Sequence, residues 1–178
     1  MKAPSARRLV VAAIAVVAAV VLGAVITRGE DGVAPETEQR AAPAISLPEV
    51  LDPAERIELQ SLRGRPVVIN LWASWCVPCR KEMPNFEAAH QRFGDRVAFL
   101  GVNHQDGRTP ARELLRQTGV TYPSGSDPEG KVAADYALRG MPSTVFVSAS
   151  GQIRATRTGE LSRSQLEDMI EKLLLPAR

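Results

Sequence analysis

Hydrophobic and polar positions divide the chain of 178 residues into an apolar block, a polar stretch and a longer mixed region. The block, residues 9–26 (LVVAAIAVVAAVVLGAVI), contains no charged side chain. As a helix that rises about 1.5 Å per residue it would reach about 27 Å, close to the thickness of a hydrocarbon core. Lys2, Arg7 and Arg8 precede it, and positive charge favours the cytoplasmic side. This pattern predicts a cytoplasmic basic N-terminus over 1–8 and a transmembrane signal-anchor over 9–27.

A cleaved secretory signal is the alternative interpretation of this block. Such signals usually have an apolar core of about 7–15 residues that ends at small residues. The block is longer than that and ends in Ala24-Val25-Ile26, a poor cleavage site, so we favour the uncleaved anchor. Both interpretations place the rest of the chain outside the cytoplasm, where disulfides persist. If the segment is cleaved, the protein is secreted.

The polar stretch, residues 28–44, has no periodicity and is rich in Pro, Gly and Glu. This composition is typical of a flexible linker. The folded domain is therefore expected to span residues 45–178.

The first part of that domain predicts a strand, a helix and a second strand. Residues 67–72 (VVINLW) and 97–102 (VAFLGV) are short apolar runs, the pattern of buried strands. Residues 76–93 between them have apolar positions at helical spacing. Strands connected by a helix of this length form a βαβ unit in which they lie parallel.

The second part predicts three helices and a hairpin. One helix begins at Thr109-Pro110, as cap and first-turn proline, and ends at Gly119. A turn at 127–130 (DPEG) leads into a short helix through Tyr136. Residues 144–147 (TVFV) and 153–158 are expected to form an antiparallel hairpin around Ser150-Gly151.

The last helix has the clearest signals. Ser162 and Gln165 have the spacing of a capping box, and Pro176 ends the helix. Five apolar positions lie on one face: Leu166, Met169, Ile170, Leu173 and Leu174. Together these elements predict an α/β domain with a central mixed sheet and helices on both faces.

Charge changes the expected class of partner. The whole chain has a formal net charge of +2, but four of its 22 basic residues lie in or beside the apolar block. Residues 29–178 therefore carry 18 bases and all 20 acids. A slightly acidic domain gives no electrostatic reason to expect nucleic-acid binding.

The chemistry is expected at the two cysteines, Cys76 and Cys79. They lie where the first buried strand gives way to a helix, and the N–H groups and dipole of a helix N-terminus favour a thiolate over a thiol. We expect Cys76 to be the exposed nucleophile. Cys79, covered by the next helical turn, would be the resolving thiol.

Two other interpretations of the pair remain open. A structural disulfide would close a very small loop and would stabilise the fold weakly. A zinc or copper site would need further ligands, for which only His90 and His104 are available besides carboxylates. Each of these histidines is more often simply solvated.

Residues 72–84 (WASWCVPCRKEMP) resemble the active-site segment of the thioredoxin superfamily. More narrowly, the chain is similar to the membrane-tethered TlpA/ResA-like thioredoxins, which include the reductases of cytochrome c maturation. The similarity covers about residues 44–175, including SLRGRPVVINLWASWC, VAFLGVN and DPEGKVAADYALRGMPSTVFV. It implies a thioredoxin-like fold, with a central mixed β-sheet flanked by helices, preceded by one N-terminal transmembrane helix.

The resemblance also implies roles for residues outside the cysteine pair. Pro142 would be the family's cis-proline facing the cysteines, and the backbone of Met141 would pair with an extended substrate. Trp75 would help to form the docking surface. Glu82 would lie near the cysteines and influence their ionisation, although a surface glutamate is an equally good interpretation. Asn70 occupies the position of the buried aspartate of cytoplasmic thioredoxins, so that route for proton transfer is absent.

The implied activity is thiol–disulfide exchange without a metal or an organic cofactor. Cys76 attacks a protein disulfide, and Cys79 resolves the mixed disulfide and leaves Cys76–Cys79 oxidised. Apocytochrome c is one candidate among the protein thiol substrates. A membrane thiol reductase of the CcdA type would supply electrons. The alternatives are an oxidant that donates its disulfide to envelope proteins and a non-catalytic metal-binding or adaptor module.

Overall fold

The computed structural model describes residues 40–175. Within this range no helix is both long enough and apolar enough to cross a bilayer. The anchor predicted over 9–27 lies outside the described residues, as do most of the predicted linker and Pro176.

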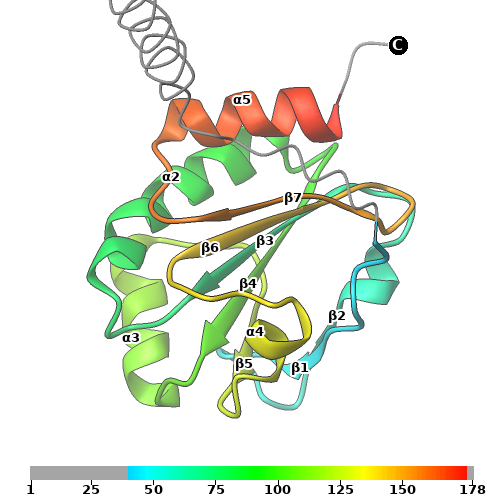
Figure 1. The fold of residues 1–178 in the computed structure, drawn as a ribbon. Coiled ribbons are helices and arrows are strands. Elements are labelled where there is room, and N and C mark those ends of the chain that lie inside the picture. The colour runs from blue at the N-terminus through cyan, green and yellow to red at the C-terminus, as the bar shows by residue number, and fades with distance from the viewer. Residues whose placement is uncertain (1–39, 176–178) are drawn as a thin grey trace, which may run out of the picture. The chain divides into compact units, whose positions relative to one another are not determined.

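A five-stranded mixed sheet forms the centre of the domain, in the order β5-β4-β3-β6-β7 (Figure 1). The strands are β3 (Val67–Trp72), β4 (Ala98–His104), β5 (Ser124–Asp127), β6 (Ser143–Val147) and β7 (Ile153–Thr158). β3 pairs in parallel with β4 and antiparallel with β6. Every residue of β3 is buried, as expected for a central strand that is covered on both faces.

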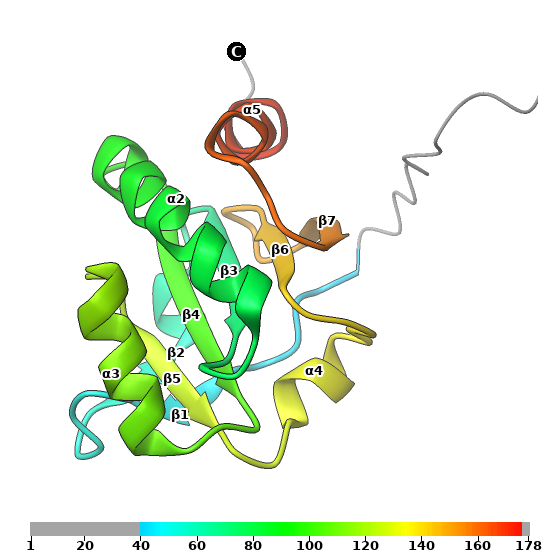
Figure 2. The same cartoon turned by 90° about the vertical axis from the view of Figure 1, so that its left-hand side faces the viewer.

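Helices cover both faces of this sheet, as the sequence predicted (Figure 2). They are α2 (Val77–Phe93), α3 (Arg108–Thr118), α4 (Lys131–Asp135), α5 (Arg163–Leu174) and the 3-10 helix η1 (Leu59–Leu62). Apolar side chains of α2, α3 and α5 share one core with Val68, Phe99 and Phe146 of the sheet. On the opposite face, α4 and η1 pack over Ile69 and Leu100.

Two helix ends follow the sequence signals and one does not. Ser162 and Gln165 form the predicted capping box at the start of α5. Gly119 ends α3 with a φ of 69°, a left-handed conformation that glycine adopts at little cost. The predicted cap at Thr109 is wrong, because α3 begins at Arg108, two residues before Pro110, and Gly107 is its N-cap.

Three short strands were not predicted. β1 (Ser46–Pro48) and β2 (Arg56–Glu58) form a two-stranded antiparallel sheet beside β5. β5 has the sequence SGSD, which lacks the β-branched and aromatic residues of typical strands. It is a strand because it pairs in parallel with β4.

The folded domain begins before residue 45, which corrects the predicted end of the linker at residue 44. Ile153 N–H donates a hydrogen bond to the carbonyl oxygen of Arg40 at 2.9 Å. The Tyr136 hydroxyl donates to the carbonyl oxygen of Pro43 at 2.7 Å. Residues 40–43 therefore pack against the hairpin and the end of α4. The side chains of residues 40–43 do not indicate this contact in the sequence, because the acceptors are the backbone carbonyl oxygens of Arg40 and Pro43.

We predict that Tyr136→Phe lowers the free energy of unfolding by about 1 kcal/mol, because it leaves the Pro43 carbonyl without its donor. Tyr122→Phe is the matched control, since the Tyr122 hydroxyl is buried and has no partner among the described residues. That change should be neutral or slightly stabilising. Denaturant unfolding of both variants measures the difference, and equal effects would contradict the prediction.

Candidate active site

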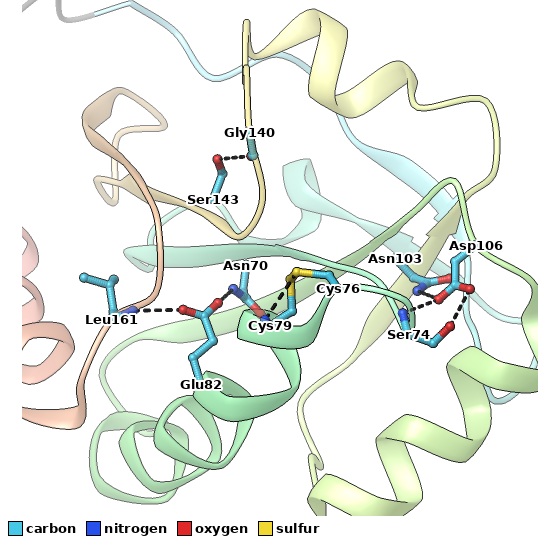
Figure 3. The surroundings of a disulfide bond; sticks show 10 residues. All are labelled: Asn70, Ser74, Cys76, Cys79, Glu82, Asn103, Asp106, Gly140, Ser143 and Leu161. Carbon is cyan, nitrogen blue, oxygen red and sulfur yellow. Dashed lines mark hydrogen bonds between the residues drawn. A yellow bond between two sulfur atoms is a disulfide. The ribbon is translucent and has the colours of Figure 1, made fainter.

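The cysteine pair forms the first turn of α2, where the chain leaves β3 (Figure 3). Cys76 is the N-cap residue in an extended conformation, and its sulfur accepts a hydrogen bond from Cys79 N–H at 3.3 Å. Pro78 follows in the first turn, where its missing N–H costs nothing. A disulfide joins Cys76 and Cys79, with 5.3 Å between their Cα atoms.

The two sulfur-bearing residues differ in access. Cys76 retains 5% of its surface and Cys79 none. The order is the predicted one, but Cys76 is less exposed than the sequence suggested because neighbouring residues cover most of it. Trp75 and Val77, by contrast, are 57% and 63% exposed. The less buried sulfur thus lies between two exposed apolar side chains.

A cis peptide joins Met141 and Pro142, as the resemblance implied. The loop around this bond is held from two sides. Gly159 N–H donates to the Pro142 carbonyl oxygen at 2.9 Å, and the Ser143 hydroxyl donates to the Gly140 carbonyl oxygen at 2.7 Å. Met141 packs against the core cluster that contains both cysteines. In Figure 3 the loop from Gly140 to Ser143 lies opposite the disulfide.

Glu82 is fully buried, so the interpretation as a surface glutamate is wrong. Its carboxylate accepts hydrogen bonds from Asn70 Nδ2 at 2.8 Å and from Leu161 N–H at 3.0 Å. Burial disfavours the charged form and raises the pKa of Glu82 from 4.5 to about 7, although the two hydrogen bonds oppose this change. Glu82 follows Cys79 by three residues on α2, so both lie on its buried face.

Asn70 lies in the middle of β3 and is 1% exposed. Its amide donates to Glu82, while its Oδ1 has no partner among the described residues. The asparagine cannot carry a proton, but it fixes the direction of a carboxyl group that can. In Figure 3, Asn70 lies between Glu82 and Cys79.

Sequence reasoning missed Asp106, which follows β4. Its carboxylate accepts hydrogen bonds from the Ser74 N–H and hydroxyl at 2.6 and 2.7 Å. Asn103 Nδ2 donates to the same carboxylate at 2.9 Å. The available signal was position: Asn103 and Asp106 come at the carboxyl end of the strand parallel to β3, and such ends meet at one edge of a sheet.

Neither histidine is simply solvated. His90 is half-buried, and its ring packs edge-on against Phe99 and Tyr122, with ring centroids 5.3 and 5.8 Å away. His104 is half-buried beside Gly130. Residues 40–175 contain no group of three or more His, Cys, Asp or Glu side chains placed to hold a metal ion.

The family model described as AhpC/TSA matches residues 39–156. The chain belongs to the AhpC/TSA family. Within this family it is 36% identical over 138 residues to the thiol:disulfide interchange protein DsbE of Xylella fastidiosa (strain Temecula1), covering 77% of this chain and 67% of the relative. It is 26% identical over 120 residues to the thiol-disulfide oxidoreductase ResA of Bacillus anthracis, covering 67% and 69%.

Solved structures share the fold of this chain. The crystal structure of a DsbF homologue from Corynebacterium diphtheriae superposes with a TM-score of 0.72 at 25% identity, covering 82% of this chain and 97% of that one. The chain is therefore a thiol–disulfide oxidoreductase of the DsbE and ResA type with a thioredoxin-like α/β fold.

We predict that Glu82 makes the oxidised protein less stable as the pH rises from about 4.5 to about 7. Over that range the unfolded chain releases the proton and the folded protein keeps it, so the stability is complete below pH 4.5 and is lost towards pH 7. The loss is roughly 3 kcal/mol at most.

Glu82→Gln should remove this pH dependence, because a glutamine amide does not titrate. The fold should accept the change, since Asn70 can turn its side-chain amide so that Oδ1 accepts from the new Nε2. Glu129→Gln, which alters an exposed carboxyl, should retain it. Denaturant unfolding at a series of pH values gives both curves. A wild-type curve that rises or stays flat between pH 4.5 and 7 would show that Glu82 is not strained by its burial.

Proposed function

We propose that this oxidoreductase reduces disulfides of extracytoplasmic proteins, with Cys76 as the nucleophile and Cys79 as the resolving thiol. The observation that carries the proposal is the joint position of the pair: it opens α2, opposite a cis-proline loop, with a buried carboxyl group one turn further on. A structural disulfide would need none of these neighbours.

The reaction transfers two electrons from the cysteine pair to the substrate. The Cys76 thiolate attacks one sulfur of a substrate disulfide, whose S–S bond breaks, and the first substrate thiolate leaves and takes a proton from water. Cys79 then gives its proton to the Glu82 carboxylate and attacks Cys76, which releases the second substrate thiolate, and this thiolate takes up a proton from water as Glu82 returns its own to the solvent. The protein ends with the Cys76–Cys79 disulfide and the substrate with two thiols.

Glu82 suits the role of proton acceptor for Cys79. A group with a pKa near 7 is partly deprotonated at neutral pH and can both accept and return a proton. Water reaches this part of α2 poorly, because Glu82 and Cys79 are both fully buried. A fixed carboxylate in such a place replaces the solvent as the base.

Substrate docking is assigned to the surface on both sides of Cys76. Trp75 and Val77 supply exposed apolar area, and the backbone of Met141, beside Pro142, can pair with an extended segment as an added strand. No hydrogen bond within the domain occupies the Met141 backbone among the described residues. A flexible polypeptide around a disulfide fits this surface better than a compact one.

The reducing direction is supported by the environment of Cys79. A protein oxidises others strongly when its fold stabilises the reduced thiolate. Here full burial and the neighbouring carboxyl of Glu82 both disfavour a charged Cys79. These features remove the Cys79 thiolate as a source of stabilisation of the reduced pair, which favours the pair as an electron donor.

The extracytoplasmic location rests on the apolar residues 9–26 and on the resemblance to tethered thioredoxins. In that location a membrane thiol reductase of the CcdA type would reduce the pair again, and apocytochrome c is the substrate that the resemblance suggests. An anchor would keep the domain near its electron donor and raise the effective concentration.

We predict that Cys79→Ser accumulates mixed disulfides with its substrates, because nothing then resolves the bond to Cys76. Affinity purification under non-reducing conditions, followed by mass spectrometry, identifies the adducts. Cys76→Ser is the control and should form far fewer. Adducts confined to cytoplasmic proteins would overturn the proposed location, and an absence of adducts would overturn the proposed activity.

We also predict that the Cys76–Cys79 pair has a reduction potential at or below about −250 mV, in the range of thioredoxin rather than of strong oxidants. Tryptophan fluorescence, with Trp72 and Trp75 beside the pair, follows the equilibrium with dithiothreitol. A value near −120 mV, typical of a strong oxidant, would favour donation of the disulfide to envelope proteins instead.

A further inference from the structure

The Asp106 carboxylate accepts four hydrogen bonds from the loop after β3, from the end of β4 and from the loop after β4, all at the same edge of the sheet. Ser74 donates its N–H and its hydroxyl, Asn103 donates its side-chain amide, and Gly107 donates its N–H at 2.8 Å. Ser74 belongs to the loop that leads from β3 to the cysteines. Figure 3 shows this cluster on the opposite side of Cys76 from Glu82.

These contacts hold the loop immediately before the nucleophile. Residues 73–76 form a tight turn in which Cys76 N–H donates to the Ala73 carbonyl oxygen at 3.2 Å. Ser74 lies inside this turn and is bound to Asp106 through backbone and side chain. Displacement of Ser74 would therefore move Cys76 relative to α2.

The same loop after β4 also supports Trp75. The indole N–H donates to the Gln105 carbonyl oxygen at 3.2 Å. Gln105 has a φ of 44°, a left-handed conformation that a residue with a side chain adopts only when its surroundings require it. The Gln105 N–H donates to the Asp127 carbonyl oxygen at 3.0 Å. The next residue in the loop is Asp106, which the hydrogen bonds from Ser74 fix in place.

We propose that Asp106 is a positioning residue for thiol–disulfide exchange: through Ser74 it fixes the turn that presents Cys76, and through the loop of Gln105 it fixes Trp75. This inference rests on the proposed function, in which Cys76 attacks the substrate. Asp106 touches neither sulfur nor substrate in this role, and it exchanges no proton.

Positioning and simple electrostatics make opposite predictions for this residue. A carboxylate near Cys76 repels a thiolate, so loss of its charge alone would favour the thiolate and speed the reaction at neutral pH. Loss of its hydrogen bonds would instead loosen the turn. Small displacements of reacting groups can cost about a hundredfold in rate.

The test uses Asp106→Asn, which removes the charge and places an amide N–H₂ among donors. Glu87→Gln is the matched control, since Glu87 likewise accepts the N–H and hydroxyl of one residue, Thr121, and a side-chain amide, that of Gln91. It lies in the second half of α2, away from the cysteines. Rate constants for the reduced proteins with oxidised glutathione and with a disulfide-containing peptide are measured across pH.

We expect Asp106→Asn to lower both rate constants about tenfold to a hundredfold, also at pH values where Cys76 is fully ionised, and Glu87→Gln to leave them unchanged. Ser74→Ala should lower them about fivefold, the effect of one hydrogen bond, and Ser74→Thr should restore most of that loss. Thermal unfolding of each variant separates these effects from a general loss of stability.

Three outcomes would overturn the inference. An unchanged rate for Asp106→Asn would show that the turn holds without it. A faster reaction would show that charge, and not position, is what Asp106 contributes. An equal loss in Glu87→Gln would show a general effect of stability. Each of these leaves the proposed function standing if Cys76→Ser abolishes exchange, whereas an inert wild-type protein would overturn the function itself.

Discussion

The rest of the site depends on one contact, the hydrogen bond that the sulfur of Cys76 accepts at the N-cap of α2. The sulfur accepts the N–H of Cys79, an otherwise unsatisfied donor at the helix start. While this bond is present, the nucleophile lies at the positive end of the helix dipole. The cost is that the capping atom takes part in the reaction, and the fold must therefore hold the turn by other contacts while the sulfur changes its bonds.

Those other contacts come from both sides of the turn. On one side the buried carboxyl of Glu82 joins α2 to β3 through Asn70 and to the start of α5 through Leu161. On the other side Asp106 joins the turn to the loop after β4. One carboxyl group is desolvated and can exchange a proton, whereas the other is saturated with donors. Glu82 thus serves proton transfer, and Asp106 serves the position of the turn before Cys76.

The sequence predicted those features that depend on local chemistry or on periodicity. The buried run 67–72, the helix after Cys76 and the capping box at Ser162 all have strong local signals, and the structure confirms them. β5 and the contact of residues 40–43 depend on backbone pairing with distant segments, which side-chain patterns do not encode. For Asp106 the sequence offers only its position after β4, and for Glu82 it left a buried and a surface interpretation level, because partners 32 and 79 residues away decide their hydrogen bonds.

The hydrogen bond from Leu161 to Glu82 has a consequence for the order in which the protein matures. A ribosome delivers both cysteines and Glu82 well before Leu161 and α5 are made. Until that segment exists, the carboxyl group has only the Asn70 amide as donor and α2 lacks the helix that packs against it. A nascent chain that stops short of Leu161 therefore carries two thiols whose neighbouring base is not yet fully bonded.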